Sequence, residues 1–175
     1  RYTVLHAPKG RANQMNYAAA QASGDVVWFV HCDSQLPRDA HAQISNAVEK
    51  GAKWGCFRIG FDGTGLFMSY NTLMSNLRAK RGIAFGDQGI WVQRELYDLL
   101  GGFPDLPIME DYELSLRMRK QKVPLAVLPG RIITSGRRYR TRFPLWTMWQ
   151  MFYLRCLYRC GVDINEIARR YKDIR

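Results

Sequence analysis

The chain has 175 residues, which fits a single domain, and its hydrophobic fraction of 47% suffices for a sizeable core. No apolar stretch reaches the ~18 residues that span a bilayer, and no signal peptide is visible, which argues against a membrane-spanning protein. The net charge of +11 and the pI of about 9.8 favour anionic partners, which include nucleic acid, phosphorylated small molecules and an acidic membrane surface.

The four cysteines show no paired metal spacing. Cys156 and Cys160 are four residues apart in a predicted helix, where two buried packing thiols are a better interpretation than a metal or redox pair. Nothing in the chain requires an oxidising compartment, and we predict a cytoplasmic protein. Since the chain begins with Arg1 rather than Met, we expect its natural start to lie upstream.

Predicted strands and helices alternate through the first half of the chain. Residues 26–30 form a continuous apolar run, which is typical of a central strand covered on both faces. Pro37 can begin the next helix, and Gly51 ends it. In chain order, we predict a strand over 2–6, a helix over 13–22, a strand over 26–30, a helix over 37–50, a strand over 54–61 and a helix over 66–77.

The second half continues the alternation and ends in helices. In chain order, we predict a strand over 89–92, helices over 95–100 and 111–120, a strand over 123–128 and helices over 146–158 and 165–171. Asp163 and Glu166 resemble a capping box at the start of the last helix. The alternation implies an α/β domain with a largely parallel sheet, in which ligands bind beyond the carboxyl ends of the strands. We predict one domain over 1–175, with a core over 1–140 and C-terminal helices over 141–175.

Two acidic motifs could carry chemistry. Asp33, in the motif His31-Cys32-Asp33, could bind Mg²⁺ or Mn²⁺ together with diphosphate oxygens, because these hard cations prefer oxygen ligands. The alternative is a strand-ending aspartate that caps a loop. Glu110 and Asp111 precede a helical pattern, where a carboxylate could remove a proton from a hydroxyl group. The helix dipole alone also favours acids there.

Basic residues gather in two segments. Lys9-Gly10-Arg11 precedes a helix, whose free N–H groups could bind phosphate, although a turn with solvated charges explains the same residues. Arg137-Arg138-Tyr139-Arg140 is denser, and it is either a phosphate-binding segment or a plain solvated loop.

The predicted helix over 146–158 is rich in aromatic residues and carries Arg155, with Arg159 just beyond it. Packing on the core is the first interpretation. The second is a helix that lies on a membrane, with aromatic and basic residues at the boundary.

Five motifs, in order along residues 4–140, resemble those of family-2 glycosyltransferases. They are GRANQMN at 10–16, GDV at 24–26, HCDSQLP at 31–37, GDQGI at 86–90, and the stretch from GGFP at 101–104 to MEDYEL at 109–114. The chain looks closest to small soluble bacterial members that carry His-x-Asp where others carry Asp-x-Asp.

The resemblance implies a GT-A fold, which is a Rossmann-like, mostly parallel mixed sheet flanked by helices. It also implies a nucleotide-diphosphate sugar donor, an acceptor hydroxyl, a divalent metal (Mn²⁺ or Mg²⁺) and inversion at the anomeric carbon. Members usually begin with a strand–loop–helix unit that binds the nucleotide base, and we expect this chain to lack that unit.

Carried over position by position, the resemblance assigns the metal to Asp33 and puts His31 in the place of the first acid. Asp111 would be the general base, with Glu110 beside it. The expected donor-binding residues are Lys9, Arg11, Asn13, Arg137 and Arg138, and the expected acceptor-binding residues are Asp87 and Gln88.

Two other functions stay open. A catalytically inactive GT-A domain that serves as a binding or scaffold module is favoured by His31 and by the expected missing start. A basic nucleic-acid-binding domain is the third, but the chain lacks a helix-turn-helix, RNP or zinc pattern and its charges are dispersed. We therefore predict no nucleic-acid partner.

Overall fold

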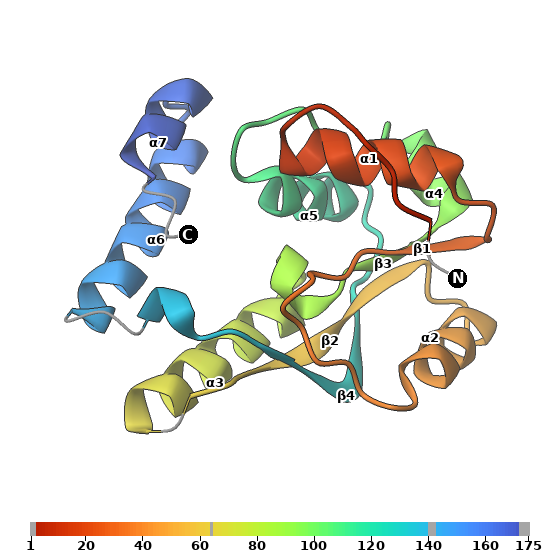
Figure 1. The fold of residues 1–175 in the computed structure, drawn as a ribbon, viewed down its shortest axis with the longest axis horizontal. Coiled ribbons are helices and arrows are strands. Elements are labelled where there is room, and N and C mark those ends of the chain that lie inside the picture. Colours follow the sequence, from red (N-terminus) through yellow and green to blue (C-terminus); the bar gives the residue numbers. More distant parts are fainter. Residues whose placement is uncertain (1–2, 64, 140–142, 172–175) are drawn as a thin grey trace.

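Helices and strands alternate along the chain in the computed structural model, which describes residues 3–63, 65–139 and 143–171 (Figure 1). Their order is α1 (Arg11–Gln21), β1 (Val26–Trp28), α2 (Ala40–Glu49), β2 (Trp54–Phe61), α3 (Leu66–Lys80), the 3₁₀ turn η1 (Gly86–Gln88), β3 (Trp91–Gln93), α4 (Arg94–Leu99), α5 (Glu110–Lys120), β4 (Ala126–Thr134), the 3₁₀ turn η2 (Arg137–Tyr139), α6 (Pro144–Arg159) and α7 (Ile164–Arg170).

Four strands form one mixed sheet in the order β1-β3-β2-β4. β3 is antiparallel to both neighbours, with Val92 opposite Val27 of β1 and Trp91 opposite Gly55 of β2. β2 and β4 are parallel, with Gly55 opposite Ala126. The prediction of a mostly parallel sheet is therefore wrong for the pairings, of which two in three are antiparallel. β1, β2 and β4 nevertheless run in the same direction.

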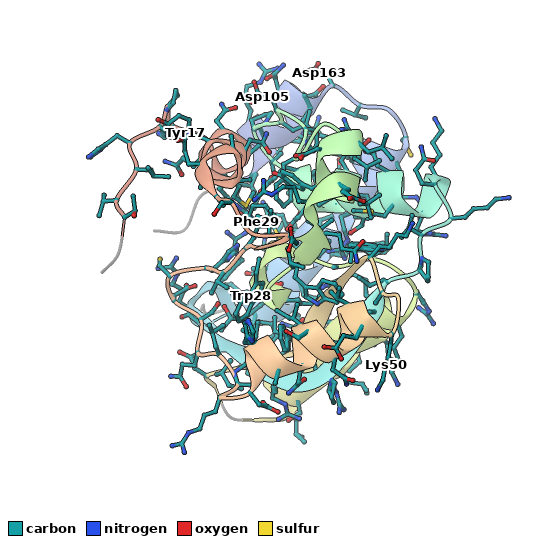
Figure 2. All side chains as sticks on the ribbon, turned by 90° about the vertical axis from the view of Figure 1, so that its right-hand side faces the viewer. Tyr17, Trp28, Phe29, Lys50, Asp105 and Asp163 are labelled. Atoms are coloured by element: carbon teal, nitrogen blue, oxygen red, sulfur yellow. The ribbon has the colours of Figure 1, made fainter. Side chains whose placement is uncertain are left out.

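Two strand predictions near the start of the chain need correction. Residues 3–6 form no strand and are exposed, so no neighbouring strand satisfies their backbone; Tyr2 lies outside the described residues. β1 lies at the edge of the sheet rather than at its centre. The segment is apolar because helices cover both faces of the sheet there. Phe29 points toward α1 and Trp28 points to the opposite side, toward α2 (Figure 2).

Helices cover both faces of the sheet, with α1, α4 and α5 on one side and α2 on the other (Figure 1), while Ala79 of α3 joins the core cluster beneath α1 and α5. Beneath α1 and α5, the core includes Ala12, Phe29 and Leu114. Ile44 of α2 packs on Phe57 and other residues of the opposite face. These two clusters fix the sheet between the helical layers, which is the arrangement that the alternating pattern predicts.

The C-terminal helices α6 and α7 pack on the domain through a third cluster. Leu154 and Ile167 are fully buried and meet Tyr112 of α5. Asp163 caps α7, because its Oδ1 accepts hydrogen bonds from the backbone N–H groups of Asn165 and Glu166. Residues 141–142 and 172–175 of the predicted C-terminal segment lie outside the described part of the chain. Among the described residues, no helix has both the length and the apolar character needed to cross a bilayer.

Candidate functional site

The start of α5 presents two adjacent acids, Glu110 and Asp111. Met109, the residue before them, has a φ of 70°, which a non-glycine side chain rarely adopts. Its side chain is buried beside Ile83 and Tyr112, and this packing holds the strained turn. The turn places both acids in the first turn of the helix, where the helix dipole stabilises negative charge.

Arg11, the first residue of α1, bridges the two acids. Its Nε lies 2.9 Å from Glu110 Oε1, as an ion pair without hydrogen-bond alignment, and its Nη2 lies 3.7 Å from Asp111 Oδ2. The Glu110 side chain is only 2% exposed. Burial and the neighbouring Asp111 raise the pKa of Glu110, whereas Arg11 opposes that rise. Arg11 thus faces the acidic pair directly.

Gly86 lies between Asp111 and the side chain of His31. Its backbone N–H donates a hydrogen bond of 2.8 Å to Asp111 Oδ2. A Cβ on Gly86 would lie 2.8 Å from His31 Nε2 and 3.1 Å from Arg11 Nη2, so both side chains pack against the glycine. Four segments that are distant in sequence therefore meet here, contributing Arg11, His31, Gly86 and Asp111.

His31 connects the two acidic motifs electrostatically. Burial and Arg11 lower the pKa of His31, against the opposing effects of Asp87, Asp111 and Asp33. Asp33 and Asp111 therefore act on one imidazole, although 77 residues separate them in sequence. The family resemblance, which assigns the metal to Asp33 and the general base to Asp111, requires this proximity.

Beneath the acids lies a half-buried arginine, Arg78, which the sequence motifs did not reveal. The guanidinium of Arg78 sits 3.6 Å from the centroid of the Phe85 ring, and its Nη2 donates a 2.8 Å hydrogen bond to Gln88 Oε1. Burial raises the pKa of Asp87; Arg78 opposes this rise and Asp111 adds to it. Among the described residues, Asp87 Oδ1 is buried without a hydrogen-bond partner.

Gln88 does not line the surface, in contrast to the position predicted for an acceptor-binding residue. It is fully buried, and its Nε2 donates to the Phe57 carbonyl oxygen at 3.3 Å. Its Oε1 accepts from Arg78 and from the Phe85 backbone N–H. Its amide therefore orients Arg78 from below.

Asp33 lies on the exposed side of the site, next to η2. Arg137 Nη2 is 3.7 Å from Asp33 Oδ2, which brings the predicted metal ligand to one of the predicted donor-binding arginines. Within residues 3–63, 65–139 and 143–171, no group of three or more His, Cys, Asp or Glu side chains is arranged to hold a metal ion. The donor set of Asp33 and His31 fits Mg²⁺ or Mn²⁺ only where phosphate oxygens of a substrate complete it.

The other predicted donor-binding residues lie around this centre. Lys9 is exposed in the turn before α1. Asn13 packs under the same turn, with its Nδ2 3.2 Å from the place of a Cβ on Gly10. Arg138 turns toward the C-terminal helices, where its guanidinium lies 4.6 Å from the centroid of the Tyr171 ring.

A pattern in α3 could have revealed Arg78. The helix buries the polar residues Asn71 and Ser75, and Arg78 follows them at helical spacing, while Tyr70 and Leu73 on other faces are exposed. A helix that buries polar side chains and exposes apolar ones indicates that its inner face borders a polar site. The predicted end of this helix at residue 77 left Arg78 outside it.

Comparison with known proteins gives one match. The family model described as "Glycosyl transferase family 2" matches residues 1–99, which is more than half of the 175 residues. No curated protein and no solved structure matches the chain. The matched segment contains Arg11, His31, Asp33 and Asp87, and it ends before Glu110 and Asp111.

Proposed function

Because the chain belongs to glycosyl transferase family 2, we propose that it transfers a sugar from a nucleotide-diphosphate donor to an acceptor hydroxyl, with inversion at the anomeric carbon. The observation that carries this proposal is the meeting of Asp111 with Arg11, Gly86 and His31, within electrostatic reach of Asp33. A group transfer of this kind needs a base on one side and stabilisation of a departing diphosphate on the other.

Asp111 is the proposed general base. The acceptor oxygen attacks the anomeric carbon, Asp111 takes the hydroxyl proton, and the bond from that carbon to the diphosphate oxygen breaks. The electron pair of the broken bond leaves with the diphosphate. The Gly86 N–H fixes one oxygen of this base at 2.8 Å, and Arg11 ties it to the buried Glu110.

Asp33 and His31 are the proposed ligands for a divalent cation, Mg²⁺ or Mn²⁺. Phosphate oxygens of the donor would complete the coordination shell of this ion. When bound, such an ion neutralises negative charge on the leaving diphosphate. Arg137 stands beside Asp33 and adds positive charge on that side. Lys9, Arg11 and Asn13 border the donor side at the start of α1. Asp87 remains the proposed acceptor-side residue.

Donor binding should stabilise the protein and should depend on Asp33. We expect a matching nucleotide-diphosphate sugar with Mn²⁺, at about 100 times its Kd, to add roughly 2.7 kcal/mol to the free energy of unfolding. That corresponds to a rise in Tm of roughly 5–10 °C for a protein of this size. Asp33→Ala should abolish the rise, whereas Asp39→Ala, an exposed aspartate at the start of α2, should keep it. An unchanged rise in Asp33→Ala would contradict the role given to Asp33.

Gly86→Ala should impair transfer by displacing the side chains that pack on this glycine. The added methyl group would meet His31 Nε2 at 2.8 Å and Arg11 Nη2 at 3.1 Å. Because these are the ends of side chains, we expect them to shift at modest cost in stability, and we expect kcat to fall roughly tenfold or more. Gly24→Ala is the matched control, since a Cβ there would make only an ordinary contact with Val26 O at 3.6 Å. Equal kinetics in both variants would contradict this packing argument.

A further inference from the structure

The start of α6 exposes large apolar side chains that the proposed transfer does not use. Singly exposed apolar residues are normal, but a contiguous group marks a contact surface. Four lie within eight residues of one helix, and each is about half exposed or more: Leu145 (64%), Trp146 (62%), Trp149 (49%) and Phe152 (58%). We call these four residues the α6 apolar end.

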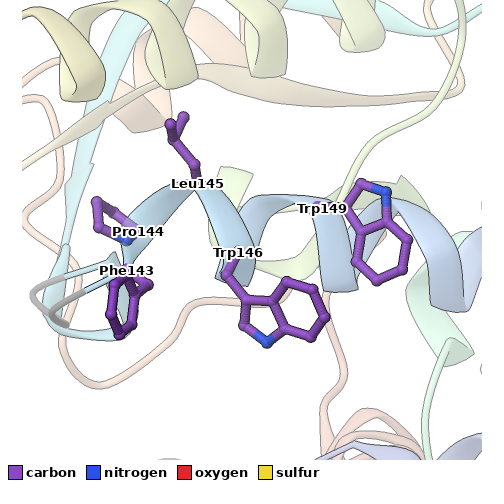
Figure 3. Close-up of a pocket in the computed structure, with 5 residues that line it drawn as sticks. All are labelled: Phe143, Pro144, Leu145, Trp146 and Trp149. Carbon is purple, nitrogen blue, oxygen red and sulfur yellow. The ribbon is translucent and has the colours of Figure 1, made fainter.

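The α6 apolar end forms one broad face of the helix, because Leu145, Trp149 and Phe152 follow one another at helical spacing and Trp146 widens this face on one side. Leu145 and Trp146 leave the helix in different directions, and both line an apolar surface pocket with Phe143, Pro144 and Trp149 (Figure 3). An exposed aromatic face of this width, with basic residues near it, is the pattern of a helix that lies at a lipid surface.

The aromatic rings of α6 are stacked on one another. The ring centroids of Trp146 and Trp149 are 5.0 Å apart, and those of Trp149 and Tyr153 are 5.2 Å apart with planes only 5° from parallel. Both faces of the Trp149 ring are thus occupied, which argues against a platform that stacks on sugar rings. Tryptophan edges of this kind are typical of the boundary between water and lipid.

The charge around the α6 apolar end fits an anionic surface. Helix α6 contains no Asp or Glu. Arg159 is exposed and lies seven residues after Phe152 and fourteen after Leu145, so all three fall on nearly the same side of the helix. Arg170 of α7, which also pairs with Glu166, reaches the far end of the ring stack, where its Nη1 donates a 2.9 Å hydrogen bond to the Tyr153 hydroxyl.

We propose that α6 docks on a membrane surface that contains anionic lipid, with the α6 apolar end inserted and Arg159 and Arg170 at the headgroups. From Pro144 to Phe152 the helix rises roughly 12 Å, at about 1.5 Å per residue, which is less than half of a ~30 Å hydrocarbon core. The helix therefore enters one leaflet without crossing it. η2 precedes α6 and holds Arg137 on Asp33, so docking would keep the proposed site beside the membrane.

Vesicle flotation tests this proposal with a matched pair of variants. Leu145→Ser removes one residue of the α6 apolar end, and Leu99→Ser removes an equally apolar side chain, 80% exposed, from α4 on the opposite side of the molecule (Figure 1). With vesicles of phosphatidylcholine and phosphatidylglycerol, we expect Leu145→Ser to lower the partition coefficient at least fivefold and Leu99→Ser less than twofold. Arg159→Gln should lower it about fivefold, and pure phosphatidylcholine should bind the wild type weakly.

Three results would overturn the proposal. The wild type could bind neither kind of vesicle. Leu145→Ser and Leu99→Ser could bind anionic vesicles equally well while both remain folded by circular dichroism. Sedimentation could instead find a wild-type dimer that Leu145→Ser disperses, with no vesicle binding, which would assign the surface to a second copy of the chain. Donor-induced stabilisation, measured without vesicles, tests the transferase proposal separately.

Discussion

Asp111→Asn is expected to lower the kcat of sugar transfer by about 10³-fold, because the amide cannot take the proton of the acceptor hydroxyl. The asparagine side chain has nearly the same shape, and its Oδ1 could still accept the Gly86 N–H that now bonds the carboxylate at 2.8 Å. We therefore expect donor binding, measured by the rise in Tm, to remain. A loss of turnover with retained donor binding would separate a chemical role from a structural one.

The matched control for Asp111→Asn is Asp98→Asn, which changes an exposed acid on α4 in the same way. Its kcat should stay within about twofold of the wild type. If Asp111→Asn turned over donor and acceptor at a comparable rate, another group would have to be the base. Glu110 would be tested next, because it is the adjacent carboxylate.

Arg78→Met should cost about 3 kcal/mol in the free energy of unfolding, because it removes a half-buried cation that offsets the charge of Asp87, whose Oδ1 is buried. The variant would lose the Arg78 hydrogen bond to Gln88 and its contact with the Phe85 ring. It would also leave Asp87 without the cation that chiefly opposes the rise of its pKa. Urea unfolding at several pH values measures both effects.

The pH dependence has a definite sign. Burial raises the pKa of Asp87 in the folded state, so the folded protein binds this proton more tightly than the unfolded chain. Stability therefore falls as the pH rises from the unfolded to the folded pKa. Since Arg78 opposes that rise, its removal should raise the folded-state pKa of Asp87 further. The loss of unfolding free energy caused by Arg78→Met should therefore be greater at about pH 8 than at about pH 4.

Two further variants isolate the contribution of the positive charge at position 78. Arg78→Lys keeps the positive charge and should recover part of the loss and most of the normal pH dependence. Arg81→Met removes an exposed arginine at the end of the same helix and should change stability by less than about 0.5 kcal/mol. A pH-independent loss in Arg78→Met would show that packing on Phe85, and not the Asp87 charge, is what Arg78 supplies.

The periodicity of the sequence predicted the helices well because each has a buried face and a clear end. α5 was predicted to begin at 111 and begins at Glu110, and β2 was predicted over 54–61 and spans Trp54–Phe61. Strand pairing could not be predicted in the same way. A three-residue strand such as β3 carries no pattern that fixes its direction, so its antiparallel pairing depends on the connections around it.

Motifs in the sequence pointed to only part of the candidate site. Asp33, Asp111 and Arg11 were singled out from motifs, and the structure brings them to one region. Arg78 and the stacking of the aromatic rings on α6 depend on packing between distant elements, which local spacing does not encode. Gln88 lies in a motif, but its burial beneath Phe85 places its amide behind the site.

The central claim is that the acids at 33 and 111 serve one sugar-transfer reaction. The most direct measurement is a screen of UDP-, GDP- and dTDP-sugars with Mn²⁺, in which sugar and nucleotide release is followed for the wild type, Asp33→Ala and Asp111→Asn. We predict that at least one donor binds and turns over with the wild type, that Asp33→Ala loses binding, and that Asp111→Asn binds without turnover. Turnover that survives both substitutions, or a wild type that binds none of these donors, would contradict the claim.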